Sequence, residues 1–161
     1  MEDRLQRYWP IPLRILLGIG FLVHGLPKLG AGHASFAGML EGMGLPGPGV
    51  LAWLVGLLEV IGGIALIVGF ATTVFTTLLA IEMLVAAFAV HLPAGFNFMN
   101  IQGMTEQGPQ FGMPGMEVPL LYLAALLALL LGGPGPLSVD ERVLAPDSRL
   151  RRPWRHREAH A

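Results

Sequence analysis

The sequence of 161 residues contains no cysteine, and charged residues make up only 13% of it. Without cysteine the chain itself can neither form a disulfide nor bind an iron–sulfur cluster through thiolates. The charged share is about half the roughly 25% usual for a soluble domain. The spaced motifs G-x-x-x-x-G-K-[ST], H-E-x-x-H and G-x-S-x-G are also missing. These absences exclude thiol chemistry by this chain and leave too little polar sequence for a separate soluble domain.

Long apolar runs take the place of that polar sequence, and hydrophobic residues make up 53% of the chain. Four such runs cover about residues 9–26, 50–70, 72–92 and 118–131. A helix needs roughly 20 apolar residues to cross the hydrocarbon core of a bilayer. The last run is short for this, so it is expected to borrow residues from the loop before it or to lie where the bilayer is thin. The sequence therefore predicts an all-α fold, an integral membrane protein built as an up-and-down four-helix transmembrane bundle.

The connections between the runs are rich in glycine and proline, which interrupt helices. Only a tight turn near Ala71 joins the second and third runs, so these two must be antiparallel neighbours. In the first connection, residues 33–43 repeat apolar side chains at helical spacing and predict a short helix on the membrane surface. The connection over residues 93–117 is expected to be a long loop.

The two ends of the chain carry most of its positive charge. We divide the chain into a four-span domain, residues 1–140, and a charged basic tail, residues 141–161, and expect loose order from Ser138 onward. Nine of the ten basic residues are arginines, and four spans place all nine on the side of the termini, with Lys28 alone opposite. The positive-inside rule then predicts cytoplasmic termini. Because Trp154 is the only stacking aromatic among the tail's arginines, the tail predicts contact with lipid headgroups and not with nucleic acid.

Ionisable residues within or beside the apolar runs each cost at least roughly 2.5–3.5 kcal/mol to insert as charges near the bilayer centre. They are Arg14, His24, Lys28, Glu59, Glu82 and His91. Helical spacing places small residues on the same faces as Arg14, Glu59 and Glu82, and small residues let a neighbouring helix approach closely. These three side chains are therefore expected to point into the bundle.

Glu59 and Glu82 are both expected near mid-membrane, whereas Arg14 lies about 6 Å from the cytoplasmic boundary by the helical rise. Two carboxylates at one depth are costly to ionise together, so they either share one proton or one of them pairs with Arg14. Two interpretations stay open. An Arg14–Glu59 ion pair would lock two helices together, whereas acids that titrate at the midplane are typical of proton relays and quinone redox sites.

His24, Lys28 and His91 lie toward the outer leaflet, with Lys28 one turn beyond His24 on the same face. They predict an outer-leaflet site that binds a lipid headgroup or a quinone carbonyl; alternatively, each histidine bonds only a backbone carbonyl or a headgroup. His91 is half a turn from Glu82 on a regular helix, so one helix face is not expected to present both. Six of the eight methionines lie in the outer segments and could bind Cu(I) with histidine, but their spacing matches no motif and no metal site is predicted.

Five segments together have the order and spacing of a known membrane family. They are R-I-L-L-G at residues 14–18, F-L-V-H-G at 21–25 with Lys28 after it, L-A-W-L-V-G-L-L-E at 51–59, H-L-P-A-G-F at 91–96 and G-M-E at 115–117. In this order they resemble the DoxX family, although Met116 replaces a usual aromatic residue and Glu82 is not typical of the family. The resemblance implies a four-helix protein of the bacterial inner (plasma) membrane, related to the small subunit of a thiosulfate:quinone oxidoreductase.

The functional hypothesis is a membrane-embedded subunit of a redox system, which anchors or couples a partner oxidoreductase to the quinone pool. Quinone, membrane lipids and a redox protein are the expected partners, and the chain is not expected to be an enzyme by itself. The polar intramembrane site would comprise Arg14, Glu59, Glu82 and Glu117. Two rival hypotheses are a small proton-coupled carrier that uses Glu59 and Glu82, and a purely structural assembly factor.

Overall fold

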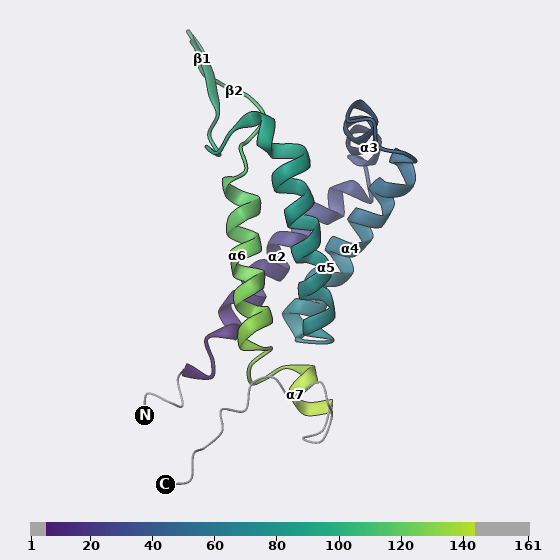
Figure 1. The fold of residues 1–161 in the computed structure, drawn as a ribbon, viewed down its shortest axis with the longest axis vertical. Coiled ribbons are helices and arrows are strands. Elements are labelled where there is room, and N and C mark those ends of the chain that lie inside the picture. The colour runs from purple at the N-terminus through teal and green to yellow at the C-terminus, as the bar shows by residue number, and fades with distance from the viewer. Residues whose placement is uncertain (1–5, 144–161) are drawn as a thin grey trace.

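The computed structural model describes residues 6–143, and four helices run along the length of its bundle (Figure 1). They are α2 (Pro10–Lys28), α4 (Pro48–Val68), α5 (Thr72–Val85) and α6 (Glu117–Gly132). A π-helical turn, η1 (Ala86–His91), and a 3-10 turn, η2 (Leu92–Ala94), continue α5. The four helices alternate in direction, so the predicted all-α, up-and-down four-helix bundle is confirmed.

Three of the four helical segments are long and apolar enough to cross a membrane: Pro10–Lys28, Pro48–Val68 and Thr72–Ala94. The fourth, α6, has 16 residues, which span about 24 Å, whereas the hydrocarbon core is about 30 Å thick. It begins at Glu117, one residue before the predicted start, so it borrows almost nothing from the preceding loop. Apolar side chains such as Leu121 cover its outer surface, where they suit contact with lipid.

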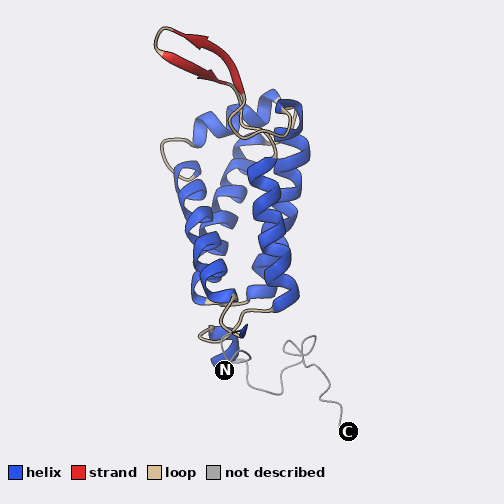
Figure 2. Cartoon of the chain, turned by 90° about the vertical axis from the view of Figure 1, so that its left-hand side faces the viewer, coloured by secondary structure: helices blue, strands red, loops and turns tan. Residues whose placement is uncertain are grey.

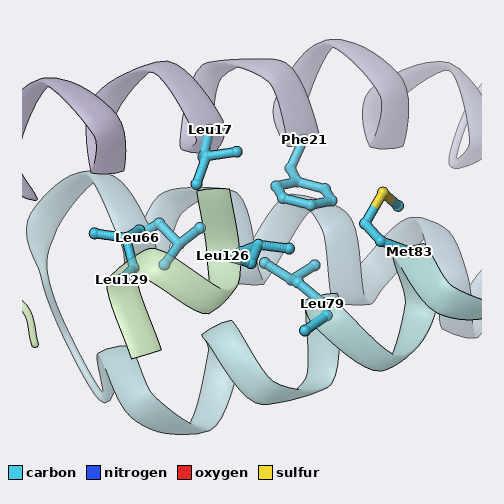
Figure 3. Close-up of a cluster of buried hydrophobic side chains, with 8 residues drawn as sticks. Leu17, Phe21, Leu66, Leu79, Met83, Leu126 and Leu129 are labelled. Atoms are coloured by element: carbon cyan, nitrogen blue, oxygen red, sulfur yellow. The ribbon is translucent and has the colours of Figure 1, made fainter. Parts of the chain in front are cut away.

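The core of the bundle receives side chains from all four helices (Figure 3). Its buried members are Leu17, Phe21, Leu66, Leu79, Ala80, Met83, Leu126 and Leu129. Lipid tails are as apolar as leucine, so burial inside the bundle gives little hydrophobic gain over contact with lipid. Close packing between the helices must therefore stabilise this core.

Helices α2 and α4 approach each other backbone to backbone at Gly18 and Gly63. A β-carbon at Gly18 would lie 2.6 Å from the carbonyl oxygen of Gly63, and one at Gly63 would lie 2.7 Å from that of Gly18. Two turns further along α2, a β-carbon at Gly25 would lie 2.8 Å from the β-carbon of Glu59. The glycine contacts therefore fix where Glu59 lies against α2.

The end of the bundle that carries Lys28 also carries α3 (His33–Gly42), the short helix that the sequence predicted. The Nδ1–H of His33 donates to the carbonyl oxygen of Lys28 at 3.1 Å, and its ring lies 4.7 Å from that of Trp53. These contacts hold α3 against α2 and α4.

At the same end, the connection before α6 was predicted to be a loop, but it contains an antiparallel hairpin of β1 (Ile101–Thr105) and β2 (Gly108–Phe111). The hairpin projects away from the helices (Figures 1 and 2). The two strands contain glycine, proline and glutamine. Because glycine and proline are uncommon in strands, the sequence did not predict a hairpin here.

The opposite end of the bundle is closed by the segment after α6, which was expected to be loosely ordered from Ser138 onward. Ser138 is instead fully buried, and the short helix α7 (Val139–Val143) follows it.

The carboxylate of Asp140 accepts hydrogen bonds from the backbone N–H groups of Ala71 at 2.7 Å and Thr72 at 2.8 Å. These N–H groups, at the start of α5, have no partner within their own helix. For residues 138–143 the expectation was wrong, because polar composition does not reveal a cap for a helix that begins 68 residues earlier. Residues 144–161 of the predicted tail lie outside the described residues.

Replacing Asp140 by alanine is expected to lower the free energy of unfolding by about 1–2 kcal/mol, because the first N–H groups of α5 lose their acceptor. Thermal unfolding in detergent micelles, followed by circular dichroism, measures the change. Glu106→Ala, at the exposed turn of the hairpin, is the control and should unfold like the wild type. Equal stability of the two variants would mean that Asp140 does not cap α5.

Candidate functional site

A cavity of about 360 Å³ lies between the helices, in the half of the bundle near α3 and the hairpin. Its volume is within the roughly 300–1,000 Å³ typical of small-molecule sites. Most of its lining is apolar, with aromatic rings from Phe21 and Phe36 among it. The ionisable side chains that line it are His24, Lys28, Glu59, Glu82, His91 and Tyr122. The cavity thus joins the three predicted outer-leaflet residues to two of the predicted intramembrane residues.

An ion pair between Lys28 and Glu59 lies at the polar side of the cavity. The Nζ of Lys28 is 2.5 Å from Oε2 of Glu59, and the side chains are 20% and 3% exposed. Gly25 makes room for this pair, because a β-carbon there would collide with the β-carbon of Glu59. A charged pair this enclosed depends on both partners, since either charge alone would remain buried and uncompensated.

The Lys28 ammonium also contacts the surface helix. It lies 4.6 Å from the ring centroid of Phe36 in α3, a cation–π arrangement. Phe36, Met39 and Leu40 of α3 all line the cavity. Lys28 therefore connects the buried carboxylate of Glu59 to α3, whose side chains line part of the cavity.

Glu82 reaches the same cavity from α5. Its carboxyl group interacts electrostatically with both Glu59 and Lys28. Its Oε2 atom is buried and has no hydrogen-bond partner within residues 6–143. The predicted proximity of the two carboxyl groups is therefore found, but the cavity supplies only one lysine for both.

His91 lines the cavity together with Glu82, which a regular helix was not expected to allow. The π-helical segment η1 begins after Glu82 and ends at His91. A π turn contains one more residue than an α-helical turn. The residues after it are therefore shifted by about 100° around the helix axis relative to a regular α-helix. This rotation brings His91 toward the face of Glu82. The Nδ1–H of His91 donates to the carbonyl oxygen of Pro114 at 2.7 Å, so its ring is also held by the loop before α6.

Tyr122 of α6 is a lining residue that sequence reasoning missed. Its ring packs edge-on against Phe21, with centroids 5.3 Å apart, and its centroid is 6.4 Å from that of His24. Gly20 of α2 leaves space for the tyrosine, because a β-carbon at Gly20 would collide with its hydroxyl group. The available signal was a lone polar aromatic residue in the aliphatic run of residues 118–131.

Arg14 is buried away from the cavity, so the Arg14–Glu59 ion pair, one of the two interpretations left open by the sequence, is wrong. Its guanidinium donates to the carbonyl oxygens of Pro134 at 2.6 Å and Leu137 at 3.5 Å. Arg14 precedes Gly25, the neighbour of Glu59, by 11 residues, which is about 16 Å along a helix. An arginine side chain cannot cover this distance. Arg14 instead anchors the segment that carries Ser138 and Asp140.

Glu117 lies at the first turn of α6 and is not among the residues that line the cavity. Its Oε2 accepts a hydrogen bond from the backbone N–H of Phe98 at 3.0 Å, and its own N–H donates to the carbonyl oxygen of Phe96 at 3.0 Å. Glu117 thus holds the loop after η2 against α6. The structure separates it from the other predicted intramembrane carboxylates.

Comparison with known proteins shows three related chains. The "Uncharacterized membrane protein Rv3486" of Mycobacterium tuberculosis is 30% identical over 138 residues, which are 83% of this chain and 80% of that protein. A protein of Haemophilus influenzae is 28% identical over 141 residues, 87% of this chain and 94% of that protein. The "Putative oxidoreductase CatD" of Bacillus subtilis is 34% identical over 85 residues, 52% of this chain and 60% of that protein. No solved structure matches the chain significantly.

A family comparison covers the part of the chain from α2 to η1, which carries many of the residues that line the cavity. The DoxX family matches residues 10–92, from the start of α2 through η1. This range includes Lys28, Glu59 and Glu82. The length of this match, together with the similarity to the mycobacterial membrane protein, shows that the chain is a membrane protein of the DoxX family.

Proposed function

We propose that this protein is the membrane-embedded subunit of a redox system and that it binds a quinone in the cavity, coupling a partner oxidoreductase to the quinone pool. The observation that carries the proposal is the cavity itself, which combines an apolar lining with the Lys28–Glu59 pair inside a membrane bundle. The name of the Bacillus subtilis relative describes an oxidoreductase, which supports redox work.

The chemistry of the lining fits a quinone headgroup. A quinone ring is flat and apolar, and its two carbonyl oxygens accept hydrogen bonds. The rings of Phe21 and Tyr122 offer aromatic edges and faces. Lys28 and Tyr122, whose side chains carry hydrogen-bond donors, both line the cavity. A membrane-embedded cavity would also give an apolar quinone tail direct access from the lipid.

Filling the cavity is expected to remove bound quinone without touching a charge. Ala86 lines the cavity, so Ala86→Phe should reduce the quinone that co-purifies in mild detergent at least tenfold, measured by solvent extraction and mass spectrometry. Ala89→Phe is the matched control, because Ala89 is exposed on the same helical segment and does not line the cavity. The proposal fails if the wild type carries no quinone and binds none when ubiquinone-1 is added, or if both variants retain it equally.

The cell location proposed here is the bacterial inner membrane, with both termini in the cytoplasm. The start of α2 and the helix α7 lie at one end of the bundle and the hairpin lies at the other (Figure 1), which supports termini on one side. Reporter domains that are active only outside the cytoplasm should be silent after Ala161, which lies outside the described residues, and active at Gln107, in the turn of the hairpin. An active fusion at Ala161 would contradict this topology.

A small proton-coupled carrier is the second candidate function, because Glu59 and Glu82 share one membrane cavity. Proton-coupled uptake by the purified protein in liposomes would favour it over the redox subunit. A stable partner complex with neither quinone nor uptake would favour a structural assembly factor.

A further inference from the structure

The cavity is lined by more acidic side chains than lysines. Two carboxyl groups, Glu59 and Glu82, line it together with one ammonium group, Lys28. Lys28 is already engaged by Glu59 at 2.5 Å and by the ring of Phe36 at 4.6 Å. If both carboxyl groups were ionised, the cavity would hold one negative charge in excess.

The excess negative charge would lie on Glu82, because the neighbouring basic side chains already contact other groups. On α2, Lys28 is held by Glu59 of α4, and His24 lies against the ring of Tyr122 of α6. On its own helical segment, His91 donates its Nδ1–H to Pro114. Within residues 6–143, the buried Oε2 of Glu82 has no hydrogen-bonding partner, and the carboxyl group of Glu82 lies against that of Glu59.

A buried carboxylate beside a second carboxylate is costly, so without a cationic ligand a proton on Glu82 supplies the missing positive charge. A ligand that brings its own positive charge can replace that proton. The surroundings decide which cations qualify. A small hydrated cation would lose its water among the apolar side chains, whereas an organic cation with an apolar body would fill the cavity and meet the rings of Phe21, Phe36 and Tyr122.

We propose that the cavity binds a hydrophobic organic cation, whose charge lies beside Glu82 and displaces one proton from this carboxyl group into the solvent. The O–H bond of Glu82 breaks, the carboxylate pairs with the cation, and no electron moves. The cation site does not depend on quinone binding, and it gives the carrier alternative a class of ligand.

The test uses tetraphenylphosphonium with the full chain in detergent micelles, measured by equilibrium dialysis between pH 6 and pH 8. Since one proton leaves for each cation bound, the affinity should rise by up to about tenfold per pH unit where Glu82 is protonated. The protein should also release up to one proton per cation in weakly buffered solution. Triphenylphosphine oxide, which is neutral and similarly apolar, should bind at least tenfold more weakly.

Variants distinguish binding of the cation at Glu82 from its non-specific uptake into the micelle. Glu82→Gln should lower the affinity for tetraphenylphosphonium at least tenfold at pH 8 and abolish proton release. Glu106→Gln, at the exposed hairpin turn, should leave both unchanged. If Glu82→Gln does not fold, the pH dependence of the wild type and the behaviour of Glu82→Asp, which keeps a carboxyl group, still decide the matter.

The proposal is overturned if the affinity of the wild type is independent of pH, if the neutral phosphine oxide binds as tightly, or if Glu82→Gln binds like the wild type. Its failure is distinct from failure of the quinone proposal. Quinone binding is scored with neutral ubiquinone-1 and the Ala86→Phe variant, and neither result depends on the cation.

Discussion

Lys28→Ala is expected to lower the free energy of unfolding by roughly 3–5 kcal/mol, the range for breaking a buried ion pair. The variant leaves Glu59, with its side chain 3% exposed, without a cation. It also leaves Glu82 beside a second, uncompensated carboxyl group. Both carboxyl groups would then have to be protonated or remain as unpaired charges.

Glu59→Ala should cost less than Lys28→Ala, because the freed ammonium can turn to Glu82, with which it already interacts. The double variant should be less damaged than the sum of the two single variants, with a coupling of about 0.5–3 kcal/mol. Unfolding in mixed detergent micelles, followed by circular dichroism, measures all three variants.

The matched control is Arg7→Ala, which removes the other ion pair within residues 6–143. Arg7 lies 3.2 Å from Glu141, and the two side chains are 57% and 38% exposed. Exposed pairs typically contribute about 0–1 kcal/mol, so this variant should stay close to the wild type. Strict additivity of Lys28→Ala and Glu59→Ala would contradict the structural role of the buried pair.

Gly63→Val is expected to disrupt the contact between α2 and α4. Its β-carbon would lie 2.7 Å from the carbonyl oxygen of Gly18, and a backbone atom cannot turn aside as a side chain can. The helices would have to separate, at roughly 1–3 kcal/mol for an overpacked core and toward the upper limit here. Because the same contact fixes Glu59 against Gly25, the variant should also weaken ligand binding in the cavity.

Gly49→Ala is the control for this prediction. Gly49 lies in the first turn of α4, and a β-carbon there would have nothing within 4 Å. Alanine favours a helix over glycine, by up to about 1 kcal/mol in a helix interior, so Gly49→Ala should equal or exceed the stability of the wild type. Thermal unfolding in the same detergent compares the two variants. If Gly63→Val were as stable as Gly49→Ala, the close approach of α2 and α4 would be incorrect.

The positions of the charged residues show where sequence reasoning reached its limit. Glu59 and Glu82 were both expected to point into the bundle, and both line the cavity. Arg14 was considered as the partner of Glu59 and Lys28 was not, because helical rise gives the depth of a residue along one helix but not where two helices cross. Gly25 and Gly56 bring the end of α2 against Glu59, and so Lys28 becomes its partner in place of Arg14.

The sequence by itself determined the four apolar runs, the short helix α3 and the inward faces of Arg14, Glu59 and Glu82. These features depend on local composition and helical periodicity, which can be read from a short stretch of sequence. The tertiary structure alone decided three others. The π turn rotated His91 toward Glu82, the segment after α6 returned to cap α5 through Asp140, and Tyr122 entered the cavity opposite Gly20. The cap and the place of Tyr122 depend on contacts between residues distant in the chain, and the π turn departs from the regular helical period on which the sequence pattern was read.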